Sequence, residues 1–351
     1  MTREPVRVAL VGAGYFARFH LDAWLRLETA RLVAVCDRDP ATHAHVRDAD
    51  AGIPVYGDLD AMLDAESPEL VDVATPPDTH LALVSAIVER KAERKLDVIC
   101  QKPLAPTRDE AARVVQCCEE AGVGLAVHEN IRWTPWHREM ARLIEAGALG
   151  RLHRVSMRLR PGDGQGADAY LSRQPYFQSM PRFLVHETAI HWIDTFRFLF
   201  GEITGVFARL ERLNPVISGE DSGIVVFAFE NGASGIFDGN RLNDHVSDNP
   251  RRTMGEMWVE GSAGILRLDG AARLWWKPHG KAEVEHRYAW HDRGFAGDAV
   301  LATQAHIVSH LREGAPLENS GRDYLRNLDV EEAVYASSVE GRWIALPPIR
   351  S

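Results

Sequence analysis

Short apolar runs separated by amphipathic segments fill the first third of the chain. A buried strand is expected at each run: Val6–Val11, Leu32–Cys36, Leu70–Ala74, Val98–Cys100 and Gly124–Val127. Helical segments lie between these runs. The first spans Tyr15–Leu27, and another opens with a capping box formed by Thr107 and Glu110. Alternating strands and helices predict an α/β fold with a doubly wound parallel sheet and helices on both faces.

The pattern changes after residue 125. Helices are expected over 135–147 and 181–200. Each begins at a proline, Pro135 or Pro181, and each ends at a glycine, Gly147 or Gly201. Strand-like runs then follow one another without helices between them, at 203–212, 222–229, 233–240, 254–260 and 264–268. Asn231-Gly232 predicts a hairpin between two of these runs. Two helices, over 296–313 and 321–340, close the chain.

This change of pattern divides the chain into two expected domains, residues 1–125 and 126–351. The length of 351 residues agrees with this division, since domains average about 150 residues. The second domain is expected to be α+β, with an open, mostly antiparallel sheet, and its closing helix 321–340 to pack back near the first domain. An open sheet face must be covered, which predicts a homodimer or homotetramer.

The composition excludes several kinds of partner. A formal net charge of −10 argues against nucleic acid and against anionic membrane surfaces, because both require a basic face. No apolar run reaches the roughly 18 residues of a transmembrane helix. The four cysteines, Cys36, Cys100, Cys117 and Cys118, form no C-x-x-C pair and are expected to be reduced thiols in a cytoplasmic protein.

A glycine-rich turn follows the first predicted strand. Gly12-Ala13-Gly14-Tyr15-Phe16-Ala17 matches the pattern G-x-G-x-x-G/A of dinucleotide-binding sites. In this pattern Gly12 permits the tight turn, Gly14 lets the backbone approach a pyrophosphate, and Ala17 keeps the helix close to the strand. The strand before the motif and the helix after it favour a Rossmann domain.

The cofactor preference depends on the end of the second strand. Asp37 stands where a carboxylate would accept the ribose hydroxyls of NAD and repel the 2′-phosphate of NADP. The neighbouring Arg38 could accommodate that phosphate, so NAD is predicted with NADP possible. Asp37 as a simple turn residue is the alternative.

Four further segments, together with the glycine motif, resemble the Gfo/Idh/MocA family of oxidoreductases over nearly the whole chain. They are Ala74-Thr75-Pro76-Pro77-Asp78-Thr79-His80, Gln101-Lys102-Pro103, Glu129-Asn130-Ile131-Arg132-Trp133-Thr134-Pro135 and the helix Glu187–Asp194. The resemblance implies an NAD(P)-dependent dehydrogenase acting on a hydroxyl of a sugar, a sugar derivative or a cyclitol. Gln101 stands where the family usually has glutamate, and Glu187 where it usually has aspartate.

The resemblance also implies roles for individual residues. Cofactor contacts are expected from Gly12, Gly14, Tyr15, Phe16, Ala17, Asp37, Arg38, Thr75, Pro76, His80, Gln101 and Lys102. Substrate contacts are expected from Asn130, Arg132 and Trp133. Tyr170 and Arg182, near a glycine-rich loop and the start of a helix, are weaker substrate candidates.

Oxidation of an alcohol needs a base that takes the hydroxyl proton, and reduction needs an acid at the same place. Lys102 is the first candidate, because it follows a sheet strand at the edge where α/β folds bind ligands. Glu187 and His191 are four residues apart, which would put both on one face of an α-helix. His191 is the second catalytic candidate and Glu187 its partner.

No catalytic metal is expected. His186 and Glu187 resemble the start of a zinc motif, but the second histidine would have to stand at position 190, which is isoleucine. His186 and His191 would lie about 140° apart around an α-helix.

Two other functions are also compatible with the sequence. A relative of the family could use NAD transiently to cleave or rearrange a glycoside without net redox change. Alternatively, the chain could be a nucleotide-sensing protein that kept the fold and lost the chemistry, and Gln101 is the feature that favours this reading.

Overall fold

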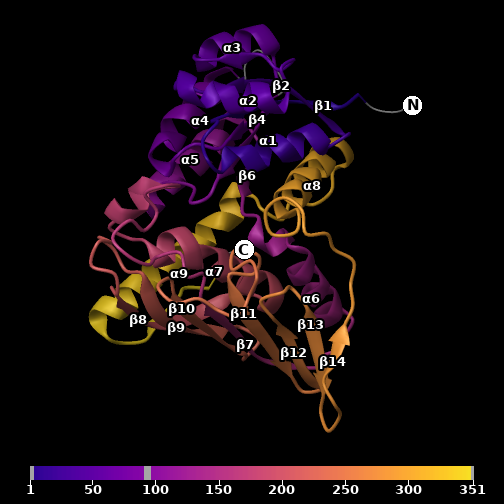
Figure 1. Ribbon diagram of the computed structural model, residues 1–351, viewed down its shortest axis with the longest axis vertical. Coiled ribbons are helices and arrows are strands. Elements are labelled where there is room, and N and C mark those ends of the chain that lie inside the picture. Colours follow the sequence, from indigo (N-terminus) through magenta and orange to yellow (C-terminus); the bar gives the residue numbers. More distant parts are fainter. Residues whose placement is uncertain (1–3, 91–95, 349–351) are drawn as a thin grey trace. The chain divides into compact units, whose positions relative to one another are not determined.

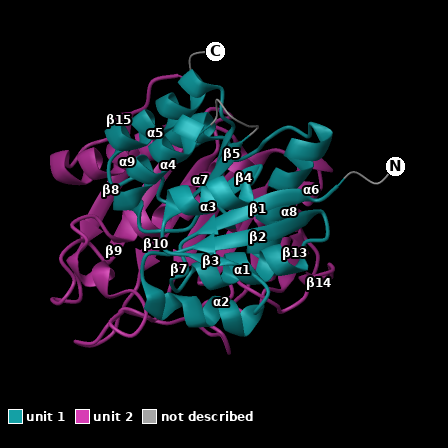
Figure 2. Ribbon diagram, turned by 90° about the horizontal axis from the view of Figure 1, so that it is seen from above, with its two compact units in different colours: residues 1–130, 298–326 teal, residues 131–297, 327–351 magenta. Residues whose placement is uncertain are grey.

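The computed structural model describes residues 4–90 and 96–348, which form two compact units (Figures 1 and 2). Unit 1 comprises the chain through Asn130 together with Asp298–Arg326, and unit 2 comprises Ile131–Gly297 and the chain from Asn327 onward. The chain thus changes unit after the boundary expected at residue 125, and it returns to unit 1 for the segment that carries helix α8.

Unit 1 contains a six-stranded parallel sheet with the order β3-β2-β1-β4-β5-β6. Its strands are β1 (Val6–Val11), β2 (Ala30–Cys36), β3 (Val55–Tyr56), β4 (Leu70–Val73), β5 (Asp97–Gln101) and β6 (Leu125–His128). The order 3-2-1-4-5-6 is that of the Rossmann fold. The strands themselves are parallel, but their order along the chain reverses between β1 and β4. The parallel sheet predicted from the sequence is therefore confirmed, with the short edge strand β3 as an addition.

Helices cover both faces of this sheet. They are α1 (Ala17–Arg26), α2 (His43–Ala49), α3 (Leu59–Glu66), α4 (His80–Glu89), α5 (Arg108–Ala121) and α8 (Ala299–Glu313). Helix α8 packs against α1, and its Ile307 and Val308 join the core formed by Leu10 and Trp24. Helix α5 begins as expected, because the Thr107 hydroxyl accepts a hydrogen bond from the Glu110 N–H at 3.2 Å.

Unit 2 contains a nine-stranded, mostly antiparallel sheet with the order β14-β13-β12-β11-β7-β10-β9-β8-β15. Its strands are β7 (Leu152–Leu159), β8 (Ile203–Glu211), β9 (Ser222–Phe229), β10 (Ser234–Asn240), β11 (Gly255–Gly261), β12 (Gly264–Leu268), β13 (Leu274–Pro278), β14 (Val284–His286) and β15 (Ile344–Ala345). Asn231-Gly232 does form the hairpin between β9 and β10. Strand β7 is not among the predicted strands; it lies in the middle of the sheet and pairs in parallel with β10.

The helices of unit 2 are α6 (Pro135–Glu145), α7 (Ile190–Phe200) and the part of α9 (Gly321–Glu340) that follows Arg326. Rings of α7 pack on the inner face of the sheet, with Phe196 against Phe227 and Trp192 against Phe237. The expectation of one α-helix over 181–200 is wrong in its first part. The helix begins at Leu184 with a π-helical turn, Leu184–Ala189, and becomes α-helical only at Ile190.

No helix in the described ranges combines the length and the hydropathy needed to span a bilayer.

Candidate active site

The glycine-rich turn of unit 1 connects β1 to α1 at the point where the strand order reverses. Gly12 has φ +103°, and a Cβ at this position would lie 2.7 Å from the carbonyl oxygen of Ala74, at the end of β4. Only glycine fits such a position. Gly14 is exposed, and a Cβ there would meet no atom within 4 Å, so space is open above the turn. Helix α1 begins without a side-chain cap, so no side chain competes with an anion for the N–H groups at its start.

Asp37, directly after β2, is hydrogen-bonded to the backbone of this turn. Its Oδ2 accepts a hydrogen bond from the Ala13 N–H at 2.7 Å, and its Oδ1 accepts one from the Asp39 N–H at 2.9 Å. Arg38 beside it is exposed. The carboxylate thus lies against the glycine turn, at the edge of the sheet where a ribose is expected.

The segment after β4 is fixed by His80. The ring of this buried histidine spans two carbonyl oxygens, with Nε2 at 2.9 Å from that of Thr75 and Nδ1 at 3.0 Å from that of Leu104. Burial lowers the pKa of His80, although the two carbonyl groups oppose the shift. His80 therefore ties the loop after β4 to the loop after β5.

Lys102 directly follows β5 and is half-buried. Its backbone N–H donates to Oε1 of Gln101 at 2.7 Å. Because the strands are parallel, the carboxyl ends of β1, β2, β4 and β5 meet at one edge of the sheet. That edge carries the glycine turn, Asp37, Thr75 and Lys102.

The end of β6 reaches the same edge. The side-chain amide of Asn319 donates to the carbonyl oxygen of Glu129 at 2.7 Å and fixes the backbone there. Asn130 is buried, and its Nδ2 has no hydrogen-bond partner among the described residues. Buried polar groups of proteins are nearly always paired, so this amide is suited to a bound polar ligand.

These features fit a nicotinamide dinucleotide. The open space above Gly14 and the uncapped start of α1 suit the pyrophosphate, and Asp37 suits a ribose. The unpaired donor of Asn130, at the same sheet edge, is left for a second polar ligand beside the dinucleotide.

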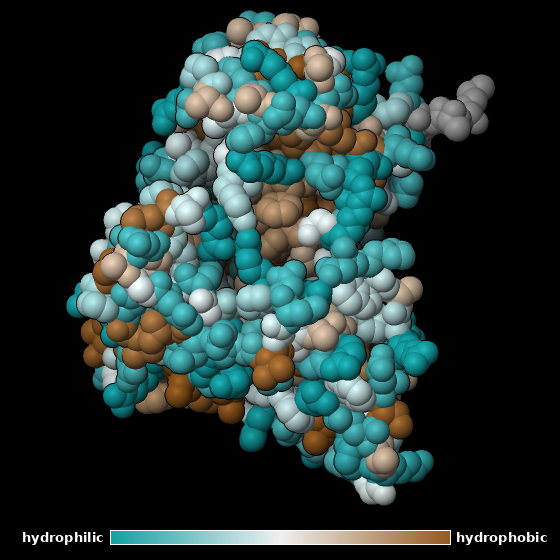
Figure 3. Space-filling view, in the orientation of Figure 1, coloured by the Kyte–Doolittle hydropathy of each residue, from teal (hydrophilic) through white to brown (hydrophobic). Residues whose placement is uncertain are grey.

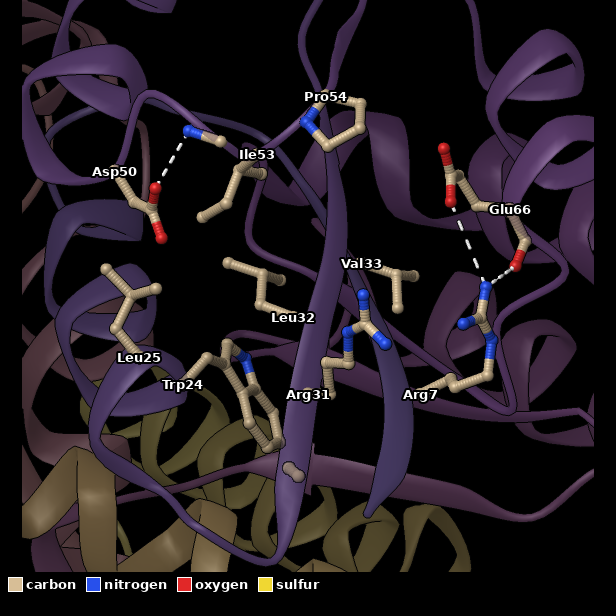
Figure 4. Close-up of a pocket in the computed structure, with 12 residues that line it drawn as sticks. Arg7, Trp24, Leu25, Arg31, Leu32, Val33, Asp50, Ile53, Pro54 and Glu66 are labelled. Carbon is tan, nitrogen blue, oxygen red and sulfur yellow. Dashed lines mark hydrogen bonds and ion pairs between the residues drawn. The ribbon is translucent and has the colours of Figure 1, made fainter. Parts of the chain in front are cut away.

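A separate hollow of about 460 Å³ lies at the opposite edge of unit 1 (Figure 4). Residues around the amino ends of β1, β2 and β3 line it, among them Arg7, Arg31, Ile53 and Glu66. Ligands of doubly wound sheets bind outside the carboxyl ends of the strands. This hollow therefore does not belong to the cofactor site.

In unit 2, the carboxylate of Glu220 organises the start of the π-helical turn. Its Oε1 accepts hydrogen bonds from the N–H groups of Phe183 and Val185 at 3.2 and 3.0 Å, and from the hydroxyl of Tyr335 at 2.6 Å. In the turn, the Ile190 N–H reaches the carbonyl oxygen of Val185, five residues back. Such turns are frequent at functional sites. Because Glu187 lies in this wider turn and His191 in α7, the α-helical spacing assumed for this pair, and for His186 with His191, is wrong.

Glu187 belongs to a partly buried ionic cluster, centred on the buried Arg241, that the sequence did not reveal. Nη1 of Arg241 donates to Oε2 of Glu187 at 2.8 Å, and Nη2 of Arg241 donates to Asp163 at 2.7 Å. Arg173 also donates to Asp163, at 2.9 Å. Tyr170 joins the cluster through its hydroxyl, 3.3 Å from Asp163. The structure thus brings together Glu187 and Tyr170, two of the predicted site residues, through Arg241 and Asp163.

Charges decide the ionisation of this cluster. Burial raises the pKa of Asp163, but Arg241 and Arg173 outweigh burial and hold that pKa below its ordinary value. Burial opposes the charged form of Arg241, yet Asp163, Tyr170 and Glu187 raise its pKa. The pKa of Tyr170 is raised, chiefly by burial. The cluster therefore holds fixed charges and an un-ionised phenol.

Arg132 is paired with Asp194 in unit 2. Nε of its buried guanidinium donates to Oδ2 at 2.6 Å and Nη2 to Oδ1 at 2.5 Å, and Asn327 donates to the same carboxylate at 2.8 Å. Trp133 lies under the guanidinium of Arg138, which is 3.4 Å from its ring centroid.

Three other residues of the predicted helix region have defined positions. Arg182 forms an ion pair with Glu332, and its guanidinium lies 4.3 Å from the ring centroid of Tyr335. Neither of these partners belongs to the Arg241 cluster. Nδ1 of the buried His186 lies 2.7 Å from Oε1 of Glu331. His191 is buried on α7. Across the described ranges, no three His, Cys, Asp or Glu side chains are grouped as metal ligands.

The chain matches one family over most of its length. Residues 6–129 match an oxidoreductase family with an NAD-binding Rossmann fold, and residues 137–267 match the GFO/IDH/MocA C-terminal domain.

Two relatives are D-apiose dehydrogenases. That of Paraburkholderia graminis is 34% identical, over 100% of this chain and 92% of its own length. That of Rhizobium rhizogenes is 32% identical, over 98% of each chain.

A crystal structure of an oxidoreductase from Agrobacterium radiobacter, in complex with NAD⁺, L-tartaric acid and magnesium, has a TM-score of 0.86 and 30% identity. The alignment covers 97% of this chain and 98% of that one. The chain therefore belongs to the Gfo/Idh/MocA family and is an NAD-dependent dehydrogenase.

Proposed function

We propose that this dehydrogenase oxidises a hydroxyl group of a sugar, sugar derivative or cyclitol, with Lys102 as acid/base and His191 assisting. The observation that carries the proposal is the position of Lys102. It follows β5 at the sheet edge that holds the glycine turn, and a hydrogen bond to Gln101 fixes its backbone.

In the proposed reaction, the amine of Lys102 takes the proton of the substrate hydroxyl as the carbinol C–H bond breaks. Bound NAD⁺ supplies the acceptor for the hydride. A lysine amine suits this step because it can take a proton in the oxidation direction and return it in the reduction direction. His191 orients the reacting hydroxyl, and Glu187, fixed by Arg241, supports the substrate side.

Cofactor contacts are proposed for Gly12, Gly14, Tyr15, Phe16, Ala17, Asp37, Arg38, Thr75, Pro76 and Lys102. His80 and Gln101, whose polar side-chain atoms already have protein partners, are proposed to fix the loops that carry these contacts. Residues 1–125 are proposed to form the cofactor domain, and the extent of unit 1, through Asn130, supports this proposal. On the substrate side, Asn130 is proposed to donate directly, and Trp133 to supply an apolar face. Arg132, Tyr170 and Arg182 are proposed to shape the site, since each already holds a partner.

The names of the relatives favour a particular substrate class. D-apiose is a branched pentose, and the two D-apiose dehydrogenases align over almost the whole chain. The test is NAD⁺ reduction followed at 340 nm with D-apiose, other pentoses, sugar acids and inositols. Sustained NADH formation with one class supports the proposal. Tight NAD binding without NADH release would instead favour redox-neutral chemistry or sensing.

A second copy of this chain is proposed to cover the outer face of the unit 2 sheet. A row of side chains crosses that face, and its apolar members are Phe207, Val226, Ile236, Trp258 and Trp275. Phe207 and Trp258 are 41% and 38% exposed, more than is usual for such large rings. In Figure 3, apolar groups interrupt the polar surface where Figure 1 places β8 and β9.

Charges of both signs flank this apolar row. On one side, Asp238 and Glu256 alternate with Arg209 and Arg158 along the register of the strands. A two-fold axis would place the same patch opposite itself, and a patch with both signs is complementary to its own copy. This supports a homodimer, or a tetramer built from such dimers.

A cytoplasmic location is also proposed. All four cysteines are free thiols. Burial raises the pKa of Cys36 to about 11 and that of Cys118 to about 12, so these thiols are poorly reactive.

A further inference from the structure

A buried carboxylate lies in the middle of the unit 1 sheet. Asp72, on β4, has no exposed surface, and an isolated charge in that position would be costly. Two donors converge on its Oδ2, Nε1 of Trp24 at 2.7 Å and Nδ1 of the equally buried His20 at 2.7 Å. The ring of His128 lies against that of His20, with centroids 4.0 Å apart and the ring planes tilted by 35°.

His20 connects this carboxylate to Gln101. Nε2 of Gln101 lies 2.9 Å from Nε2 of His20, and Oε1 of Gln101 accepts the Lys102 N–H. The four groups therefore form one continuous chain of hydrogen bonds from Asp72 to the backbone of Lys102.

The direction of every bond in this chain is determined by chemistry. The Lys102 N–H can only donate, so the oxygen of the Gln101 amide faces it and the NH₂ group faces His20. An amide NH₂ also only donates, so Nε2 of His20 must accept. His20 is then neutral and carries its proton on Nδ1, which donates to Asp72.

A second contact fixes the backbone on the C-terminal side of Lys102. His80 lies against the carbonyl oxygen of Leu104, two residues beyond Lys102. The backbone around Lys102 is thus held by Gln101 before it and by His80 after it.

We propose that Gln101, oriented by the buried Asp72–His20 pair, is the positioning residue of Lys102. The inference rests on the proposed function, in which Lys102 is the acid/base. It also gives the glutamine a physical role where the family resemblance leads one to expect glutamate. A carboxylate at position 101 could still accept the Lys102 N–H, but its second oxygen would face Nε2 of His20 and require a proton there. Glutamine keeps His20 neutral, whereas glutamate would make it an imidazolium between two carboxylates.

The hydrogen-bond chain is tested by NMR on protein with ¹⁵N-labelled histidine and backbone. Wild-type His20 should show one protonated nitrogen, Nδ1, and one unprotonated nitrogen, Nε2. In Gln101→Glu both nitrogens should be protonated. The Lys102 amide should exchange slowly in wild type and in Gln101→Glu, and fast in Gln101→Met, which keeps the volume and removes the acceptor. A protonated Nε2 in wild type, or equal Lys102 exchange in all three proteins, would overturn the proposal.

The functional consequence is tested by a double-mutant cycle with NAD⁺ and the sugar that gives turnover. Gln101→Met should lower kcat about 10- to 100-fold, the scale of a displaced catalytic group, with KM changed little. Gln101→Glu should retain most of the kcat. In a Lys102→Met background the Gln101→Met change should cost nothing further, because the two residues act as one unit. Gln116→Met, on the exposed face of α5, is the matched control and should leave kcat unchanged.

Two outcomes separate the possible failures. If Gln101→Met lowers kcat equally with and without Lys102, Gln101 acts elsewhere and the positioning role is wrong. If Lys102→Met retains full turnover, the proposed function is wrong, and the Lys102 exchange rates still report whether Gln101 holds that backbone.

Discussion

Arg241 and Glu187, 54 residues apart, form a partly buried ion pair with Nη1 and Oε2 at 2.8 Å. The same guanidinium binds Asp163. Arg241, which directly follows β10, therefore fixes both the π-helical turn that carries Glu187 and the loop after β7 that carries Asp163. Glu187 is therefore a carboxylate with its charge already balanced, which suits it for holding a substrate better than for moving a proton.

Removing this arginine should destabilise the protein. In Arg241→Met the partly buried carboxylates of Asp163 and Glu187 lose their main partner. A fully buried pair broken on one side costs about 3–5 kcal/mol, which sets the upper end of the expected loss. Urea unfolding measures this loss. Arg142→Met is the control, since its ion pair with Glu139 is at the surface and should be worth less than about 1 kcal/mol. Equal losses in the two variants would contradict the assigned role of the cluster.

Stability should fall in mild acid because of His137. Burial lowers the pKa of His137 from its ordinary 6.5 to about 4, so between these values the unfolded chain binds a proton that the folded chain does not. The contribution of His137 to the free energy of unfolding is therefore fully present above pH 6.5. It decreases as the pH falls toward 4, by up to about 3 kcal/mol in total.

Urea unfolding at several pH values checks this effect in wild type and in His137→Asn. The variant should lose less stability between pH 6.5 and 4 than wild type does. His153→Gln, at an exposed position of β7, should keep the wild-type pH dependence. An unchanged slope in His137→Asn would show that another group is responsible.

The sequence predicts unit 1 well because its signals are local. The turn at Gly12, the cap at Thr107 and the apolar strands each depend on neighbouring residues. Strand β7 also carries a local signal, since Val155, Met157 and Leu159 alternate with polar residues, but it is not among the predicted strands.

Other features depend on contacts far apart in the chain. The π-helical turn has the same apolar pattern as an α-helix, and its start is set by Glu220, on a distant loop. The pairing of Arg241 with Glu187 likewise leaves no trace in local spacing. The roles assigned to Lys102 and His191 remain predictions.

Asp37 should govern the choice between NAD and NADP. Asp37→Ser removes both the brace on Ala13 and the repulsion of a 2′-phosphate. Loss of a hydrogen bond to a charged group costs about 1.5–3 kcal/mol, so NAD should bind about 10- to 100-fold more weakly. NADP should gain relative affinity beside Arg38. Fluorescence titration with both cofactors measures this, with Asp48→Ser, exposed on α2, as the control. Tighter binding of NADP than of NAD to wild type would reverse the predicted preference.

The proposed covering of the sheet face predicts that Trp258→Glu breaks the oligomer. Trp258 lies in the apolar row, and a buried charge at the centre of an interface should weaken association by about 2 kcal/mol or more. Light scattering at micromolar concentration should find a dimer or tetramer in wild type and a shift toward monomer in the variant. Val246→Glu, on a loop where the side chain is 93% exposed, should not change the mass. A wild-type monomer would contradict the proposal.

The most direct test of the account compares wild type with Lys102→Ala for NADH formation at 340 nm, using D-apiose and any other sugar that gives turnover. NAD binding is titrated in parallel. Lys102→Ala should lower kcat about 10²- to 10⁴-fold, the usual contribution of a positioned acid/base, while NAD affinity stays within about twofold. Near-normal turnover in Lys102→Ala would contradict the assignment of this lysine as the group that takes the hydroxyl proton.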